Sequence, residues 1–344
     1  MVGDAGVRPA SDPPAGPAAE ATNAMPAPQV APASPPAPPV VGNALDSRRN
    51  IHDPAIIRDG EWYYVFSTGA GVPIHRSRDL IQWEPAGRVF RLDVPDWAKR
   101  EVPGSTIVWA PDIALVDGRY VLTYSVGTFG QNRSVIGMAS TPTLDPSRRD
   151  YTWRHDGKVV ESVVGDDHNA IDSNLFLDSN GRAWLSWGSY WTGIKLVELD
   201  RATLKPLAGA PIEPIAQRET DGGIEAPFIV ERNGWYYLFL SFDKCCSGVN
   251  STYNVRVGRS RSVDGPYYDR LNKPMSRGGG TRILETTGRV IGPGHCAVYN
   301  DRGRWLLAHH FYDGAAGGVP TLQVRELLWD TLGWPRAGAP IGGL

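Results

Sequence analysis

The sequence is poor in cysteine, in net charge and in long apolar runs. Its 344 residues include only 3 cysteines, too few for a disulfide framework, and their positions lack the spacing of a zinc site. No run of about 18 apolar residues occurs, so the sequence predicts no helix that spans a membrane. The formal net charge of −2 gives no electrostatic reason to expect nucleic acid as a partner, and a neutral substrate fits better.

Aromatic residues are absent from the N-terminal part, where the first one is Trp62. Residues 1–40 contain 11 prolines and 11 alanines, a composition that cannot bury a core and that favours an extended, solvated chain. We therefore expect residues 1–45 to form a disordered tail or linker and residues 46–344 to form one folded domain.

One pattern returns five times from residue 50 onward: an apolar run, a turn at glycine, and an alternating run rich in aromatic residues. Asp-Gly and Asn-Gly supply the positive φ of a tight turn, and the flanking β-branched and aromatic residues favour strands, so each copy predicts a β-hairpin. The copies are AIIRDGEWYYVFSTG, DIALVDGRYVLTYSVG, NLFLDSNGRAWLSWGSY, FIVERNGWYYLFLSFD and AVYNDRGRWLLAHHFYD.

The spacing of the copies predicts the fold. Successive turn glycines are 53 to 69 residues apart, at Gly60, Gly118, Gly181, Gly234 and Gly303. Because one hairpin cannot bury its own faces, copies at this period indicate a radial array of four-stranded blades. The predicted fold class is all-β, a five-bladed β-propeller. A β-sandwich would also supply many strands, but it would not produce this period.

Polar residues stand immediately before the first strand of each copy, in IHDPAII, WAPDIAL, NAIDSNLF, GIEAPFIV and GPGHCAVY. In a propeller this strand lines the central axis, so side chains at its mouth converge from different blades. Acidic residues at such positions often only cap loops. Their recurrence at one phase of the repeat favours a shared pocket formed by Asp53, Asp172, Glu225 and His295, with Trp109 beside them.

Carboxylates that share an uncharged, aromatic-rich cleft suit acid–base cleavage of a glycosidic bond. One carboxyl must donate a proton to the leaving oxygen, while another must be ionised to activate water or attack carbon. A third carboxylate raises the pKa of the acid and keeps it protonated. Trp109, Trp191 and Phe129 are expected near the mouth, where their flat faces can contact sugar C–H groups.

The ordered motifs resemble glycoside hydrolase family 43, and most closely its endo-1,5-α-L-arabinanases, over about residues 50–335. The resemblance rests on HDP at 52–54, WAPD at 109–112, YSVGTFGQNRSVIGMAS, NAID at 169–172, GGIEAPFIV, DKCCSGVNSTYNVRVGRS and GPGHCAVY. It implies a five-bladed propeller that hydrolyses its substrate with inversion of configuration. One departure is Ser173, where the family pattern has a proline that would stiffen the loop.

The resemblance also implies roles for individual residues. Asp53 is expected to be the general base, Glu225 the general acid, and Asp172 the carboxylate that tunes Glu225 and orients the sugar. Gly130, Asn169 and Ser189 resemble positions that contact the substrate.

A metal ion is also implied by the resemblance, because His295 matches a histidine near calcium or a similar ion at the propeller axis. Calcium prefers six to eight oxygen ligands, so several waters would have to complete such a site.

Other polar residues near these motifs have structural interpretations. Asp112 lies later in its repeat than Asp53 and is expected to hold a loop. His309 and His310 alternate along a strand, and we expect His310 to be the one that points toward the pocket. For Cys245 and Cys246, free thiols and a vicinal disulfide both remain open.

The expected activity is therefore endo-acting, inverting cleavage of internal α-1,5-L-arabinofuranosidic bonds of arabinan. The alternatives are an exo-acting α-L-arabinofuranosidase or β-xylosidase of the same family and a carbohydrate-binding propeller without catalysis. A retaining fructosidase fits less well, since its nucleophile stands in an Asn-Asp-Pro-Asn context and Asp53 stands in His-Asp-Pro-Ala. An exo enzyme walls off one end of its cleft, and a chain that ends at Leu344, soon after the fifth copy, favours an open groove.

Arabinan or arabino-oligosaccharides are the expected partners, with no nucleic acid and no membrane span. We expect a monomer that is secreted or extracytoplasmic, with its signal removed.

Overall fold

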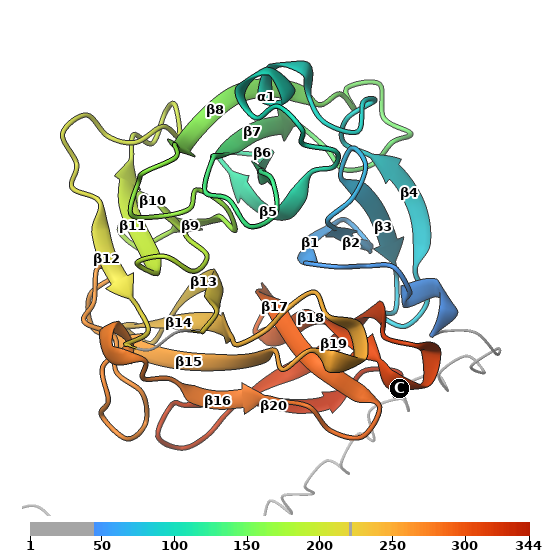
Figure 1. The fold of residues 1–344 in the computed structure, drawn as a ribbon. Helices are drawn as coiled ribbons and strands as arrows, with labels where there is room; N and C mark the ends of the chain where they lie inside the picture. Colours follow the sequence, from blue (N-terminus) through green and yellow to red (C-terminus); the bar gives the residue numbers. More distant parts are fainter. Residues whose placement is uncertain (1–44, 220–221) are drawn as a thin grey trace, which may run out of the picture. The chain divides into compact units, whose positions relative to one another are not determined.

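The computed structural model describes residues 45–219 and 222–344. They form five four-stranded antiparallel sheets arranged around a central axis (Figure 1). The predicted five-bladed all-β propeller is thereby confirmed. The expected tail lies outside the described residues, apart from Leu45.

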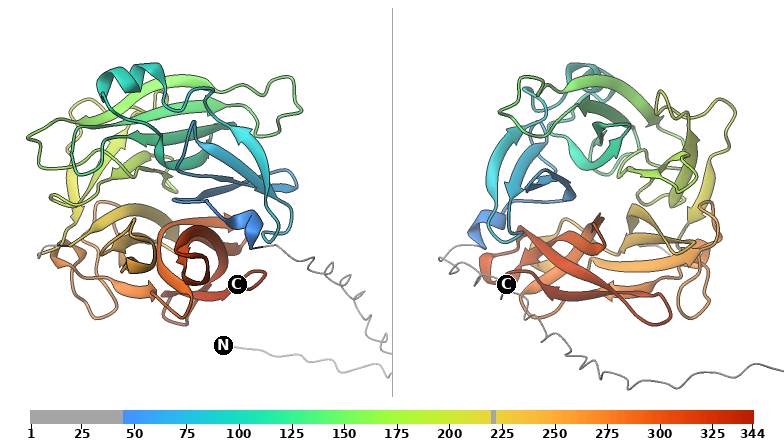
Figure 2. Two further views of the ribbon diagram at one scale, coloured as in Figure 1. Left: turned by 45° about the vertical axis from the view of Figure 1, so that its right-hand side comes forward. Right: turned by 180° about the vertical axis from the view of Figure 1, so that it is seen from behind.

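Each blade consists of four strands that are consecutive in the chain, and the first strand of each blade is the innermost one (Figures 1 and 2). Blade 1 contains β1 (Ala55–Asp59), β2 (Trp62–Phe66), β3 (Pro73–Ser77) and β4 (Glu84–Arg88). Blade 2 contains β5 (Trp109–Val116), β6 (Arg119–Val126), β7 (Ser134–Thr141) and β8 (Arg154–Ser162). Blade 3 contains β9 (Asn174–Leu177), β10 (Ala183–Trp187), β11 (Ile194–Leu199) and β12 (Glu213–Ala216).

Blade 4 contains β13 (Ile224–Arg232), β14 (Trp235–Phe242), β15 (Asn254–Ser260) and β16 (Thr281–Leu284). Blade 5 contains β17 (Val290–Asp301), β18 (Arg304–Asp313), β19 (Val319–Trp329) and β20 (Pro335–Pro340). One α-helix, α1 (Asp96–Glu101), and four 3-10 turns, η1 (Asp46–Arg48), η2 (Gly248–Asn250), η3 (Met275–Arg277) and η4 (Gly314–Ala316), lie in the connections. Among the residues that the structure describes, no helix has the length and apolar character needed to cross a membrane.

The apolar core is divided among the spaces between blades. Five clusters of buried side chains each join two neighbouring blades, so every blade buries both of its faces against others. Representative pairs are Phe66 with Tyr124, Ile136 with Trp187, Leu196 with Phe242, Phe239 with Leu307, and Val65 with Leu306.

The ring closes between the first and the last blade. Strand β1 packs against both β5 and β17, and the segment before β1 adds backbone contacts to blade 5. Arg49 forms a bridge with Thr321, and the Asn50 amide donates to the Pro320 carbonyl over 2.7 Å. Closure therefore uses backbone pairing between blades 1 and 5 as well as side-chain packing.

The hairpin turns have the geometry that the sequence predicts. All five turn glycines have positive φ, between +59° at Gly60 and +98° at Gly303. Side chains rarely adopt this backbone conformation, which explains glycine at the same place in every copy.

Asp112 connects the innermost strands of three blades, as its structural interpretation predicted. Its Oδ2 accepts hydrogen bonds from the Leu175 amide (2.8 Å) and from Asn174 Nδ2 (3.0 Å). The side-chain oxygen of Asn174 in turn accepts from the Ile229 amide over 2.8 Å. This chain links β5, β9 and β13, and burial raises the pKa of the Asp112 carboxyl to about 6 despite the hydrogen bonds.

We predict that Asp112→Ala lowers the free energy of unfolding by about 1–3 kcal/mol, because it leaves buried donors on β9 without an acceptor. Asp150→Ala is the matched control, since Asp150 is an exposed carboxylate outside the blade core that pairs with Arg148 at the surface. Urea unfolding at neutral pH measures both variants. An equal, small effect for the two would contradict the role of Asp112 in joining the blades.

Candidate active site

Five residues with the same unusual backbone conformation surround the mouth of the axis. Each lies before or within the innermost strand of its blade, with His295 at a bulge inside β17. Each has positive φ without being glycine: Asp53 (+50°), Ala110 (+40°), Asp172 (+59°), Ala226 (+54°) and His295 (+48°). This left-handed conformation costs about 1–2 kcal/mol for such residues and persists only where surrounding contacts hold it. The kink turns the neighbouring side chains of all five blades toward one space.

Side chains from adjacent blades hold four of these five residues by their amide groups. The Ala110 amide donates to Thr68 Oγ1 (2.8 Å) and the Asp172 amide to Ser125 Oγ (2.9 Å). The His295 amide donates to Ser241 Oγ (2.8 Å) and the Asp53 amide to His310 Nδ1 (3.1 Å). In each case the acceptor belongs to the preceding blade around the ring.

The remaining member, Ala226, differs in its acceptor. Its amide donates to the Asp172 carboxyl group of blade 3. The other four amides donate instead to a hydroxyl or imidazole side chain. The backbone of blade 4 therefore helps to fix the position of Asp172.

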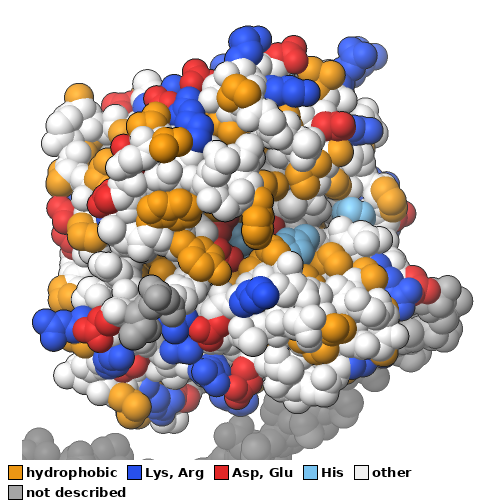
Figure 3. Space-filling view, viewed as in Figure 1, with side chains coloured by type: hydrophobic (Ala, Val, Ile, Leu, Met, Phe, Trp, Pro, Cys, Tyr) orange, Lys and Arg blue, Asp and Glu red, His pale blue; other side chains and the backbone are white. Residues whose placement is uncertain are grey.

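A cavity of about 960 Å³ opens at this mouth, with lining residues from all five blades. Figure 3 shows the hollow in the middle of this face, with acidic and histidine side chains at its bottom and hydrophobic side chains around it. Every residue that the sequence analysis assigned to the site lines this cavity: Asp53, Trp109, Phe129, Gly130, Asn169, Asp172, Ser189, Glu225 and His295.

The aromatic side chains of the cavity lie at different depths. Phe129 is 84% exposed at the rim, and Tyr190 and Trp191 are 41% and 45% exposed. Trp109 lies deeper and is only partly exposed. The rim on blades 2 and 3 thus presents flat apolar faces to solvent above a polar bottom.

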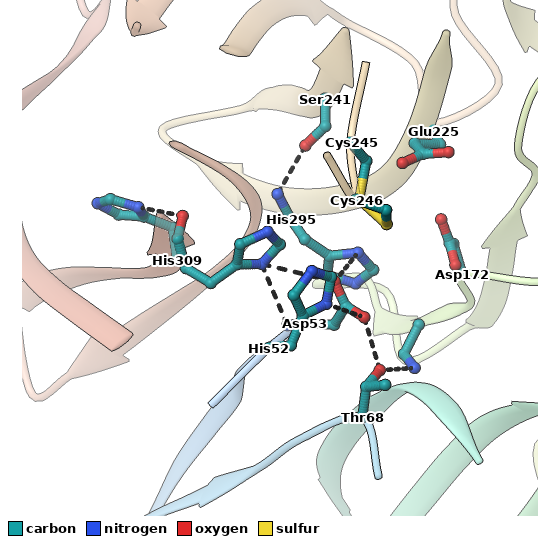
Figure 4. Close-up of polar contacts among 12 residues, drawn as sticks. His52, Asp53, Thr68, Asp172, Glu225, Ser241, Cys245, Cys246, His295 and His309 are labelled. Atoms are coloured by element: carbon teal, nitrogen blue, oxygen red, sulfur yellow. Dashed lines mark hydrogen bonds and ion pairs between the residues drawn. A yellow bond between two sulfur atoms is a disulfide. The ribbon is translucent and has the colours of Figure 1, made fainter. Parts of the chain in front are cut away.

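Asp53 lies at the bottom of the cavity among three histidines (Figure 4). Its Oδ2 is 2.8 Å from His52 Nδ1 and accepts a hydrogen bond from Thr68 Oγ1 over 2.5 Å. Its Oδ1 is 3.2 Å from His295 Nδ1 and 3.5 Å from His310 Nδ1. His310 is thus the member of the His309–His310 pair that faces the site, as predicted, while His309 bonds to a backbone carbonyl.

These neighbours set the ionisation of Asp53. Burial alone would raise the pKa of Asp53, but its interactions with the neighbouring imidazoles, of which that with His52 is the largest, outweigh burial and hold that pKa well below its usual range. Burial also opposes a charge on His52, yet Asp53 and Glu225 raise the pKa of that imidazole. Burial lowers the pKa of both His295 and His310, so a positive charge beside Asp53 is most favoured on His52.

Glu225 and Asp172 are shifted in the opposite direction from Asp53. Burial raises the pKa of Glu225, and the charge of Asp53 adds to this shift, although hydrogen bonds from Tyr253 (2.7 Å) and Ser189 (2.8 Å) oppose it. Burial raises the pKa of Asp172 well above its usual value, followed by repulsion from Glu225 and then Asp53. The two carboxyl groups therefore do not ionise together readily.

This arrangement differs in part from the expected tuning of Glu225 by an ionised Asp172. Burial is the largest cause of the raised pKa of Glu225, and Asp53 supplies the charge that adds to it. Asp172 itself holds a proton strongly. The repulsion between these two carboxyl groups is seen in the raised pKa of Asp172.

The structure contains one group of described residues that could hold a metal ion: His52, Cys245 and His310, whose ligand atoms lie within 4.8 Å of one another. Cys245 is bonded to Cys246 in a disulfide, and cysteine binds metals as a thiolate. Nitrogen and sulfur ligands also suit zinc or copper better than calcium. His295 is not in this group, so calcium beside His295 would need a shell made mostly of water.

Several residues of the site were not identified as functional from the sequence. His52 was quoted only as part of a motif, Thr68 follows β2 in a loop, and Tyr253 lies in the STYNVRVGRS segment. Tyr312 also contacts the site, with its hydroxyl 2.8 Å from His52 Nε2. Only the position of His52 beside Asp53 gave a signal in the sequence, because the other contacts depend on the three-dimensional arrangement of the blades.

Comparison with known proteins agrees with this geometry. The family model described as glycosyl hydrolases family 43 matches residues 47–340. The chain is a member of glycosyl hydrolase family 43. The resemblance proposed from the motifs is thereby confirmed.

Relatives within family 43 include both modes of action. An extracellular endo-α-(1→5)-L-arabinanase of Bacillus subtilis is 39% identical over 294 residues, which cover 84% of this chain and 88% of the relative. An exo-1,5-α-L-arabinanase from a bovine ruminal metagenomic library is 41% identical, with a TM-score of 0.81 and coverage of 85% and 97%. An α-L-arabinanase of Cellvibrio cellulosa complexed with arabinohexaose is 38% identical, with a TM-score of 0.81 and coverage of 84% and 96%.

Proposed function

We propose that this family 43 member is an extracellular arabinanase that cleaves internal α-1,5-L-arabinofuranosidic bonds by an inverting mechanism. The observation that carries the proposal is the opposite shift of two carboxyl groups in one cavity: the pKa of Asp53 is held low and that of Glu225 is raised. Groups whose surroundings separate their pKa values in this way suit the roles of base and acid. The names of the relatives support α-1,5-linked arabinan as the substrate and an extracellular location.

The proposed reaction is a single displacement. Ionised Asp53 takes a proton from water as the water oxygen attacks the anomeric carbon. The bond from that carbon to the leaving oxygen breaks, and Glu225 gives its proton to the leaving oxygen. Asp172 shares a proton with Glu225 and orients the sugar.

Substrate contacts are assigned to the residues of the cavity wall. Gly130 and Asn169 are assigned to the bound sugar, and Ser189 holds Glu225 Oε2 at 2.8 Å. Trp109 and Phe129 are assigned to apolar contacts with sugar rings, at the bottom and at the rim respectively. The catalytic domain is assigned to residues 46–344, acting as a monomer.

The endo mode is supported by the aromatic rim. Side chains as exposed as Phe129 and Trp191 stand away from the carboxyl groups, where they can contact sugar units other than the one that is cleaved. A cavity of about 960 Å³ has room for more than one such unit. The exo mode is the second candidate, because the relative from the ruminal library is exo-acting.

Chromatography of the first products from linear arabinan tests the mode. We expect a ladder of arabino-oligosaccharides and a rapid fall in polymer length. Release of a single product at constant polymer length would replace the endo proposal by the exo candidate.

Variants of the two proposed catalytic carboxylates should respond differently to the leaving group. Glu225→Ala is expected to lose most activity on arabinan but to recover part of it on an aryl arabinofuranoside with an acidic phenol, which leaves without protonation. Asp53→Ala lacks water activation and should show no such recovery. Proton NMR should show the β-anomer as the first product, and a first-formed α-anomer would contradict inversion.

The pH profile should depend on Asp172. Glu225 acts in its protonated form, so activity falls as the pH rises through its pKa. Asp53 acts ionised, so activity is lost only when the pH falls toward its low pKa. The Asp172–Glu225 pair gives up its last proton against the repulsion between two negative charges. Because Asp172→Asn removes one of these charges, the pKa of Glu225 should fall, and the alkaline limb of the pH–activity profile should move to lower pH.

Asp112→Asn is the control for that shift, because Asp112 is also buried with a raised pKa but lies outside the cavity. We expect this variant to keep the alkaline limb of the parent at temperatures where both are folded. An unchanged limb in Asp172→Asn would show that the two carboxyl groups titrate independently.

A calcium or similar ion beside His295 is retained as a separate proposal. Elemental analysis of the purified protein, before and after prolonged chelation, tests it. We expect one ion per chain, whose removal lowers activity while the circular dichroism spectrum is preserved. Full activity without a stoichiometric ion would leave His295 as an uncharged neighbour of Asp53.

A further inference from the structure

A vicinal disulfide lies at the wall of the cavity, and its place is not explained by the proposed reaction. Cys245 and Cys246 follow β14 in blade 4, form a disulfide and both line the cavity. Figure 4 shows the bridge beside Glu225, on the same side of the cavity as the histidines that surround Asp53. Cys246 is exposed to solvent and has φ +59°, a left-handed conformation that is unfavourable for cysteine.

The disulfide is connected to Asp53 through two side chains. The Cys246 amide donates a hydrogen bond to Tyr312 Oη over 2.8 Å, and Cys245 Sγ lies 3.4 Å from the same oxygen. Tyr312 Oη is 2.8 Å from His52 Nε2, and His52 Nδ1 is 2.8 Å from Asp53 Oδ2. Three blades therefore meet in this chain of contacts: blade 4 at the cysteines, blade 5 at Tyr312 and blade 1 at His52.

The hydrogen atoms in this chain of contacts can be assigned. Burial raises the pKa of Tyr312 above its usual value, so its phenol is neutral and has one hydrogen to donate. Since the Cys246 amide already donates to the oxygen, that hydrogen goes to His52 Nε2 when the imidazole is neutral. When His52 is charged, Nε2 donates to Tyr312 instead, and the phenol hydrogen turns to the weak acceptor Cys245 Sγ. In both states Nδ1 of His52 carries a hydrogen, and this nitrogen lies 2.8 Å from Asp53 Oδ2.

We infer that Tyr312 is a positioning residue, which holds His52 against Asp53, and that the Cys245–Cys246 disulfide holds the amide that orients Tyr312. This inference rests on the proposed role of Asp53 as the base. His52 is further restrained by stacking on His310, with ring centroids 3.8 Å apart. The Tyr312 hydroxyl contacts the other ring nitrogen of His52, Nε2, at 2.8 Å.

Reduction of the disulfide should release this arrangement locally. A dithiol reductant gives two electrons and two protons to the bridge, so that the S–S bond breaks, two thiols form, and the reductant closes to its own cyclic disulfide. Without the bridge, Cys246 can leave its left-handed conformation and its amide can move away from Tyr312. Backbone and side-chain hydrogen bonds from Ser251 and Thr252 to the Lys244 carbonyl still hold the base of the loop.

The first test separates kcat from KM on linear arabinan. Tyr312→Phe removes one oxygen, and we expect kcat to fall on the order of tenfold, the rate equivalent of one hydrogen bond, while KM stays nearly constant. Tyr267→Phe is the matched control, because its buried hydroxyl bonds to the Val263 carbonyl away from the cavity. It should keep the kcat of the parent. Unchanged kcat in Tyr312→Phe, or an equal loss in both variants, would overturn the inference.

The second test asks whether the disulfide acts through Tyr312. Dithiothreitol should lower kcat of the parent toward that of Tyr312→Phe, and should change neither Tyr312→Phe nor the double variant Cys245→Ala/Cys246→Ala. Thiol titration confirms reduction in each sample. An equal further loss in Tyr312→Phe, or an effect of reduction on KM alone, would show that the disulfide only shapes the wall of the cavity.

A measurement without turnover keeps this inference separate from the proposed function. The ¹⁵N resonance of His52 Nε2 should shift on reduction of the parent and on Tyr312→Phe, but not on reduction of Tyr312→Phe. Failure of the parent to hydrolyse arabinan would refute the proposed function alone. If the His52 Nε2 resonance shifts neither on reduction of the parent nor on Tyr312→Phe, the positioning role is refuted, whatever the substrate.

Discussion

The left-handed residue before or within each innermost strand is the constraint on which the site depends. A propeller brings five strands to one axis, but an extended strand alternates its side chains between its two faces. The kinks at Asp53, Ala110, Asp172, Ala226 and His295 break that alternation and direct side chains toward the mouth. Each kink is unfavourable alone, and an acceptor from the preceding blade stabilises it in each case, so the site exists only in the closed ring.

The same coupling between blades explains how one cavity holds carboxyl groups in opposite states. Asp53 is buried, which alone would favour its neutral form, but imidazoles from blades 1 and 5 surround it. Glu225 and Asp172 come from blades 4 and 3, where burial is the largest influence on both carboxyl groups and the lowering effect of His52 on Glu225 is the last of the causes. The opposite pKa shifts thus follow from which blade supplies each side chain. A small change in how the blades pack would alter the pKa values of Asp53, Glu225 and Asp172 before it altered the fold.

The sequence was sufficient for the fold and for Asp53, Asp172, Glu225 and His295, because these follow from periodicity. Turn glycines at the same place in five copies predict the blades, and polar residues before the first strand of each copy predict convergence at the axis. Gly130, Asn169 and Ser189 followed from the family resemblance, and alternation along the last hairpin selected His310. The other partners were not predictable in this way. Thr68, Ser241 and Tyr312 lie on second strands or after them, and their contacts join different blades. The open alternatives for the cysteines were decided by the position of the Cys245–Cys246 loop, which carries no periodic signal.

The ionisation of the whole cavity also bears on the proposed reaction. Ionised Asp53 is balanced in part by His52, and Asp172 and Glu225 do not ionise together readily. The bottom of the cavity therefore holds a buried negative charge at Asp53 before the substrate binds, although the protein as a whole is close to neutral. Cleavage of a glycosidic bond develops positive charge at the anomeric carbon. A buried negative charge stabilises that transition state more than the neutral sugar of the ground state, and this difference is what accelerates the chemical step.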